Sequence, residues 1–238
     1  MKSFVNNIEH TFFNFLVSVG FLKKDKNIVF KQTNIDAEIV FSFGCFYVSK
    51  ANVYNTSCNF NISFTSINTF FVDCFEKDVF LFYDSDDKKV NVISGFGLFY
   101  VQNLYGENSY PDGIYSIFTR QQVEETPDLV SAYLQREYYE KCLLDIEEKY
   151  GTIEKADKTI NDEILSNGFV KKHNINWADF DNQCIRSLLF GYFNNNPRIA
   201  ELVEICNRTM MEEKLKNPKN SRIPLYNFIL NKMGFQAI

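Results

Sequence analysis

The stretch LVSVGFLKK, Leu16 to Lys24, separates a helical start of the chain from a sheet. Apolar residues recur at three- and four-residue spacing between Ser3 and Val19, which predicts an amphipathic helix. Gly20 predicts the end of this helix, because glycine adopts the left-handed conformation after a last turn without steric cost. Phe21 can then fold back onto that turn. The chain beyond this point should therefore begin a different kind of structure.

The next seventy residues alternate between apolar and polar side chains and are rich in Phe, Val, Ile, Tyr and Thr. Such alternation predicts half-buried strands, and the Asn, Asp, Ser and Lys clusters between them predict turns. Short links favour an antiparallel meander, with the first helix covering one face. The predicted strands are IVFKQT (28–33), EIVFSFGCFYV (38–48), CNFNISFTSI (58–67), DVFLFYD (78–84) and KVNVISGFGLFYV (89–101).

The second half of the sequence returns to helical spacing. Thr126 and Pro127 predict a helix start, and a stripe of apolar residues beginning at Leu129 continues to Tyr150. Further helices are expected over 152–167, 181–193 and 197–216, followed by a last apolar stretch that ends at Gly234. The fold class is therefore α+β. We expect a sheet region over residues 1–118 and a helical region over 119–238, packed either on the same core or as a separate domain.

The nonapeptide ILSNGFVKK, Ile164 to Lys172, resembles the opening stretch. The sequence after it returns to helix instead of continuing as a strand, so the similarity is better explained by shared helix-cap chemistry than by a duplicated module. Lysines that follow such a helix end also suit the negative end of the helix dipole.

The charges are unevenly distributed along the 238 residues. The balance is -1 over residues 1–100, -8 over 101–169 and +4 over 170–238, which sums to the net charge of -5. General nucleic-acid binding needs a dominant basic face, so we expect no nucleic-acid partner. The uncharged run over residues 11–22 is too short to span a bilayer, and we expect no membrane association. The six cysteines lack CxxC spacing, which indicates reduced, buried thiols in a cytoplasmic protein.

No motif in the sequence predicts catalysis, a metal site or a cofactor. The chain has two histidines, His10 and His173, and neither accompanies a nucleophile signature or a zinc-ligand spacing. Glu137, Glu140 and Glu147 lie on the long predicted helix, where nearby Arg136 and other cations account for them as a salt-bridged face.

The N-terminal segment, with Phe15 and Leu16 leading into Gly20 and then IVFKQT and EIVFSF, resembles small uncharacterised bacterial α+β domains of the immunity-protein type. The resemblance covers roughly the first hundred residues and implies a non-catalytic binding protein. On this basis we expect a cytoplasmic protein-binding module, an immunity or adaptor protein, that meets a basic partner surface through acidic residues.

The expected partner-binding residues are Glu137, Glu140 and Glu147. Two alternatives stay open. One is an enzyme whose site is assembled between sheet and helices around His173, Trp177, Asp179 and Asp181. The other is a homo-oligomer that associates through an exposed sheet face.

Overall fold

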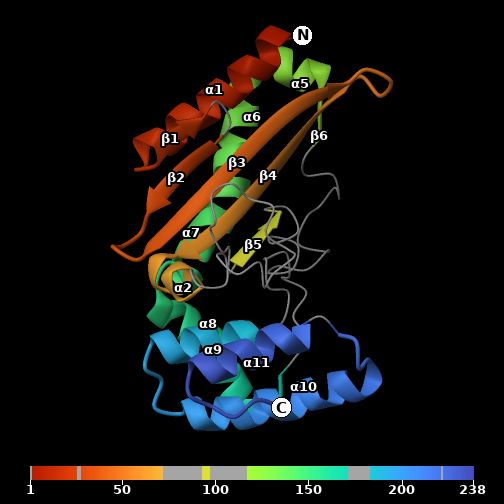
Figure 1. Ribbon diagram of the computed structural model, residues 1–238. Helices are drawn as coiled ribbons and strands as arrows, with labels where there is room; N and C mark the ends of the chain where they lie inside the picture. The colour runs from red at the N-terminus through yellow and green to blue at the C-terminus, as the bar shows by residue number, and fades with distance from the viewer. Residues whose placement is uncertain (1, 26–27, 72–92, 97–116, 171–182, 221) are drawn as a thin grey trace. The chain divides into compact units, whose positions relative to one another are not determined.

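The computed structural model describes residues 2–25, 28–71, 93–96, 117–170, 183–220 and 222–238. The fold is α+β, with an N-terminal helix, an antiparallel sheet and a mainly helical second half, as the sequence predicted (Figure 1). The chain divides into two compact units: residues 1–62 with 94–148, and residues 63–93 with 149–238. The helices between residues 119 and 148 thus belong with the sheet, so the division does not follow the boundary expected at residue 118.

Three helices end with the glycine cap that the sequence predicted. Helix α1 (Lys2–Ser18) is followed by Gly20 at a φ of 98°, and the N–H groups of Gly20 and Phe21 donate to the carbonyls of Val17 and Leu16 at 3.1 and 3.0 Å. This pair of bonds is a Schellman motif, and the same pair recurs at Gly234. Gly168, at a φ of 70°, makes the simpler cap, with one bond from its N–H to the carbonyl of Ile164 at 2.9 Å.

The sheet has the strand order β1-β2-β3-β4-β5, and β6 also pairs with β4. Antiparallel pairing sets Val29 opposite Phe41 and Tyr54 opposite Phe118. The strands are β1 (Leu22–Asp25), β2 (Ile28–Gln32), β3 (Ala37–Val48), β4 (Val53–Phe64), β5 (Ile93–Phe96) and β6 (Ile117–Thr119). The predicted strand over 78–84 lies outside the described residues.

The predicted strand over 58–67 is wrong at both ends. Strand β4 begins earlier, at Val53, and residues Thr65–Phe70 form helix α2. Ile67 and Phe71 are both buried, whereas Thr69 between them is exposed. Residues four apart share one side of a helix, but on a strand Thr69 would face the same side as both of them. The short strands β1 and β6 were not predicted.

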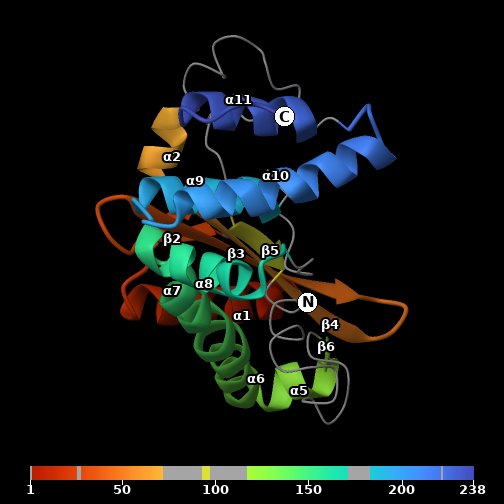
Figure 2. The same cartoon turned by 90° about the horizontal axis from the view of Figure 1, so that it is seen from below.

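One face of the sheet forms the core of the first unit. Alternate residues of β3, among them Phe41 and Phe43, are buried beneath α1 and the long helix that follows residue 127. The ring centroids of Phe12 and Phe43 are 4.9 Å apart, and Tyr138 lies 5.9 Å from Phe43. Figure 2 shows α1 and the helices α6 (Pro127–Leu134) and α7 (Leu144–Tyr150) on one side of the strands. Aromatic pairs at this spacing add to the free energy of burial.

The helices that pack on this sheet are α5 (Arg120–Glu125), α6 (Pro127–Leu134), the π-helix η2 (Gln135–Leu143) and α7 (Leu144–Tyr150). Thr119 caps α5, since its hydroxyl accepts from the N–H of Gln122 at 3.1 Å while the Gln122 side chain accepts from the Thr119 N–H at 2.8 Å. Such a reciprocal capping box fixes where a helix begins.

A buried carboxylate accepts a hydrogen bond from a backbone N–H group of strand β3. Pairing between β2 and β3 reaches as far as Ile28 opposite Ser42. Beyond that point the N–H of Cys45 donates to the Glu9 carboxylate of α1 at 3.0 Å. A backbone donor that the neighbouring strand does not reach is therefore satisfied by a side chain, as buried donors require.

The second unit is built around a helix that is buried on all sides. Residues 184–191 of α9 (Gln183–Phe193) are all buried, which is the pattern of a central helix. Around it lie α2, α8 (Ile153–Asn167), α10 (Ile199–Lys216) and α11 (Arg222–Lys232). These helices confirm the predictions over 152–167 and 197–216, and the prediction over 181–193 for its described residues, 183–193. Within the described residues, no helix is both long and apolar enough to cross a membrane.

Candidate protein-binding surface on the long helix

A continuous helix of α6, η2 and α7 carries the candidate surface. A series of its buried residues recurs every four positions, at Val130, Leu134, Tyr138, Cys142 and Ile146. Along an α-helix a four-residue series drifts slowly around the helix axis, because four residues are more than one turn of 3.6. Along a π-helix, with its wider i→i+5 turn, the series drifts in the opposite direction. The two drifts offset each other, so the five residues stay on one buried side of the helix.

The opposite side of the helix is open to solvent. We call its exposed residues the outer stripe: Leu129, Ala132, Arg136, Glu140, Leu144 and Glu148. Leu129 was expected on the buried side, yet its side chain is 68% exposed, and Leu144 is 40% exposed. The stripe thus combines two exposed leucines with two carboxylates and one guanidinium.

Glu137, one of the three expected partner-binding residues, is buried. It is 3% exposed, and its carboxylate accepts from Arg136 Nε at 2.8 Å and from Lys141 Nζ at 2.9 Å. The bond to Glu137 raises the pKa of Arg136. The contact with Lys141 joins residues that are four positions apart on the helix. This carboxylate therefore serves the fold and presents no open charge to a partner.

Glu147 is engaged with the sheet. Lys31 Nζ of β2 lies 2.7 Å from Glu147 Oε2 and 2.8 Å from Oε1, so the ammonium group contacts both oxygens. Both side chains are about one quarter exposed, at 23% for Lys31 and 27% for Glu147. This ion pair ties α7 to β2 and compensates the Glu147 charge. Of the three expected residues, Glu140 is the one on the outer stripe.

The segment from Arg120 to Glu148 is acidic as a whole. It contains eight acidic and three basic residues, a balance of -5. Its cations already have carboxylate partners within the segment, since Arg120 pairs with Glu124 at 2.5 Å and the other two contact Glu137. The negative charge that remains is carried by residues such as Glu125, Asp128, Glu140 and Glu148, all exposed.

A surface cavity of about 110 Å³ lies beside the N-terminal end of this helix, between α1, α5 and α6. It is lined by Asn7, Ile8, Thr11, Val123, Pro127, Asp128 and Ser131. The sequence predicted none of these as site residues. The sequence carried no clear signal for this cavity, because the cavity depends on how α1 packs against α6, and the spacing of residues does not encode that packing.

The thiols have the character of core side chains. The five described cysteines are free and buried, as the sequence predicted. Burial, with a contribution from Glu9, raises the pKa of Cys45 to about 12, and burial also raises the pKa of Cys142 well above its usual range. A nucleophilic cysteine needs the opposite shift. The thiols of Cys45 and Cys142 therefore stay protonated at neutral pH.

The remaining site predictions gain no geometric support. The alternative pocket of His173, Trp177, Asp179 and Asp181 lies outside the described residues. His10 is exposed on α1. Among the residues with described positions, no group of three or more His, Cys, Asp or Glu side chains could hold a metal ion.

A buried polar network in the second unit is satisfied within the chain. The Asp157 carboxylate of α8 accepts from the side-chain amides of Asn161, Asn194 and Asn196, the last two at 2.7 and 2.9 Å to Oδ2. Ser187 donates to the Asn161 amide oxygen. The network joins α8 to α9 and to the loop before α10, so its role is to fix that loop.

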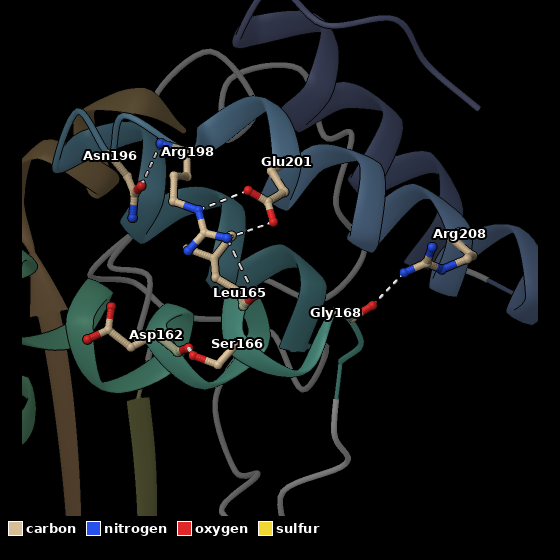
Figure 3. Close-up of polar contacts among 8 residues, drawn as sticks. All are labelled: Asp162, Leu165, Ser166, Gly168, Asn196, Arg198, Glu201 and Arg208. Atoms are coloured by element: carbon tan, nitrogen blue, oxygen red, sulfur yellow. Dashed lines mark hydrogen bonds and ion pairs between the residues drawn. The ribbon is translucent and has the colours of Figure 1, made fainter.

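Arg208 of α10 and Arg198, the N-cap residue of α10, cover the C-terminal end of α8 (Figure 3). Arg208 donates to the carbonyl of Gly168, and Arg198 donates to the carbonyl of Leu165 at 3.5 Å while it contacts Glu201 at 2.7 Å. The simple glycine cap at Gly168 leaves such carbonyls without helical partners, and cations suit the negative end of the dipole. These arginines are accounted for by helix packing.

Comparisons of the chain with protein-family models, with curated proteins and with solved structures give no match.

Proposed function

We propose that the protein is a non-catalytic protein-binding module, of the immunity or adaptor kind, that meets a basic partner through the outer stripe. The observation that carries this proposal is the set of groups left exposed after the internal ion pairs are formed. Glu140 and Glu148 remain on the stripe, while Leu129 and Leu144 expose apolar surface near its two ends. Apolar anchors surrounded by charge are typical of protein interfaces.

The stripe is also suited to recognition by its rigidity. It lies on a helix whose other side is anchored in the core by residues such as Leu134, Tyr138 and Cys142, each almost fully buried. The Tyr138 hydroxyl forms a further bond to the Thr56 hydroxyl of β4 at 3.1 Å. A surface that is held in place before binding loses little conformational entropy in the complex.

Affinity capture from the lysate of the source cells tests the proposal. The bait is the tagged full chain, compared with the charge-reversed variant Glu140→Lys/Glu148→Lys. The matched control is Glu204→Lys, which reverses an exposed carboxylate on α10 in the second unit. We expect one stoichiometric basic protein on the wild type and on the control, lost from the stripe variant and released by high salt, because salt screens exposed charges. Equal capture by all three baits would reject the proposal.

A further inference from the structure

The cavity beside the outer stripe has an apolar floor and a polar rim. Ile8 and Val123 are buried at its base, and Pro127 adds a further apolar wall. Asn7, Thr11, Asp128 and Ser131 bring side-chain amide, hydroxyl and carboxylate groups to the same space. Asp128 is the one charged residue among the seven that line the cavity, so the cavity has a single negative group.

The rim offers acceptors that the fold does not use. Within the described part of the chain, the side chains of Asn7, Thr11 and Asp128 have no hydrogen-bond partner. Ser131 accepts one bond, from Gln135 Nε2 at 3.3 Å, and a hydroxyl oxygen can accept a second. A ligand with several N–H donors and a positive charge would match this set.

The size of the cavity narrows the choice of ligand. A volume of about 110 Å³ corresponds to the liquid volume of roughly four water molecules, at about 30 Å³ for each. That is far below the 300–1,000 Å³ typical of pockets for metabolites. The space suits one amino-acid side chain better than a substrate.

We propose that this cavity is a socket for one arginine side chain of the basic partner. The inference rests on the proposed function, because it names the group by which that partner is recognised. The aliphatic stem would pack on Ile8, Val123 and Pro127, and the guanidinium would meet the Asp128 carboxylate in a two-bond contact. Arginine carries five N–H donors, more than one carboxylate can accept, and the amide and hydroxyl oxygens of the rim serve the others.

The surrounding charges favour a cation. Asp128 lies in the first turn of α6 and is exposed. Glu125 is exposed on the neighbouring α5, and its carboxylate contacts an uncharged group, the amide of Gln121 at 2.9 Å. The nearby guanidinium of Arg120 is paired with Glu124. A partner arginine would therefore approach a surface with excess negative charge.

An NMR titration of the full chain tests the socket. The probes are N-acetyl-arginine methylamide, its uncharged isostere N-acetyl-citrulline methylamide, and N-acetyl-lysine methylamide. We expect the arginine probe to shift the amide signals of Asn7, Thr11, Asp128 and Ser131, and both other probes to bind about tenfold more weakly, since charge-assisted and two-bond contacts are lost. Equal affinity for citrulline or for lysine would overturn the inference.

Two variants make the test specific. Asp128→Asn keeps the shape of the side chain and removes its charge, and it should weaken the arginine probe about tenfold. Asp162→Asn makes the same change at an exposed position on α8 and should leave binding unchanged. Equal binding by wild type and Asp128→Asn would overturn the inference, and circular dichroism establishes that both variants are folded.

The outcomes separate this inference from the proposed function. If the arginine probe fails while Glu140→Lys/Glu148→Lys still loses its partner, the socket is rejected and the binding surface stands. If the probe binds at the cavity while capture does not depend on the stripe, the socket is retained as a cation site and the proposed function is rejected.

Discussion

Replacing Glu137 by glutamine should destabilise the first unit, whereas the same change at Glu140 should not. The two residues lie three positions apart on one helix, but Glu137 is buried under two cations and Glu140 is exposed. Glu137→Gln keeps the volume of the side chain and removes the charge that compensates Arg136 and Lys141. The pair of substitutions therefore separates a carboxylate that holds the fold from one that is open to a partner.

The expected cost follows from the contacts of Glu137. Its carboxylate makes bonds of 2.8, 2.9 and 3.0 Å to two charged donors. Hydrogen bonds to charged groups contribute about 1.5–3 kcal/mol each. Arg136 and Lys141 are 58% and 34% exposed, so solvent screening reduces their share. We expect a loss of about 2 kcal/mol for Glu137→Gln and a change within about 0.5 kcal/mol for Glu140→Gln.

Hydrogen exchange of the peptide covering residues 135–143 measures this difference locally. A loss of about 2 kcal/mol should speed exchange through local or global opening roughly 30-fold in Glu137→Gln. Peptides from α9 and α10 in the second unit serve as the internal reference. Equal exchange rates in Glu137→Gln and Glu140→Gln would refute the assignment of Glu137 to the fold.

Three further predictions concern the rest of the chain. Gly168→Ala places a side chain at a φ of 70° and should cost about 1 kcal/mol in urea unfolding, whereas an unchanged midpoint would contradict the role of the left-handed cap. Asp157→Ala removes the shared acceptor of three asparagine amides and should lower the free energy of unfolding by about 3 kcal/mol. Hydrogen exchange in the loop over 194–197 should become faster. The control Asp162→Ala, on the exposed side of α8, should change the stability little. Burial raises the pKa of Cys45 from 9.0 to about 12, so the folded state favours the neutral thiol. The contribution of this neutral thiol to the free energy of unfolding should be intact below pH 9 and should be lost progressively between pH 9 and 12. Cys45→Ala should flatten that decline in urea unfolding measured across this range, and an equal decline in both proteins would contradict it.

The helix ends were predictable because their chemistry is local. Gly20, Gly168 and Gly234 each have a positive φ, which the sequence indicated through a glycine that follows an amphipathic stretch. The structure also refines the comparison of the two nonapeptides. Gly20 forms the full Schellman motif, whereas Gly168 forms a single cap bond and receives Arg208 from α10 at its carbonyl. The same nine-residue pattern thus has two cap geometries, and the surrounding helices differ.

The features that sequence spacing missed depend on distant parts of the chain. Helix α2 forms because Ile67 and Phe71 both reach the core, although the residues before them alternate as a strand. The π-helical segment lets the four-residue series continue through Tyr138, which sequence spacing alone assigned to an ordinary α-helix. Tertiary packing overrides local preference at both places.

The candidate surface was predicted in part. The acidic character of the long helix was visible in the sequence, and Glu140 is exposed as a binding residue would need to be. The contact between Lys31 and Glu147 joins residues that are 116 positions apart, so no local spacing could have indicated that this carboxylate is paired. Charge alone does not distinguish an open carboxylate from a compensated one.

The most direct test of the proposed binding surface is the association rate of the captured partner as a function of salt. Biolayer interferometry would compare the wild type, Glu140→Lys/Glu148→Lys and the control Glu204→Lys. Electrostatic steering predicts that the stripe variant associates at least about tenfold more slowly at low salt, that the difference vanishes at high salt, and that the control behaves as the wild type. An association rate that is the same for all three proteins at low salt would contradict the account.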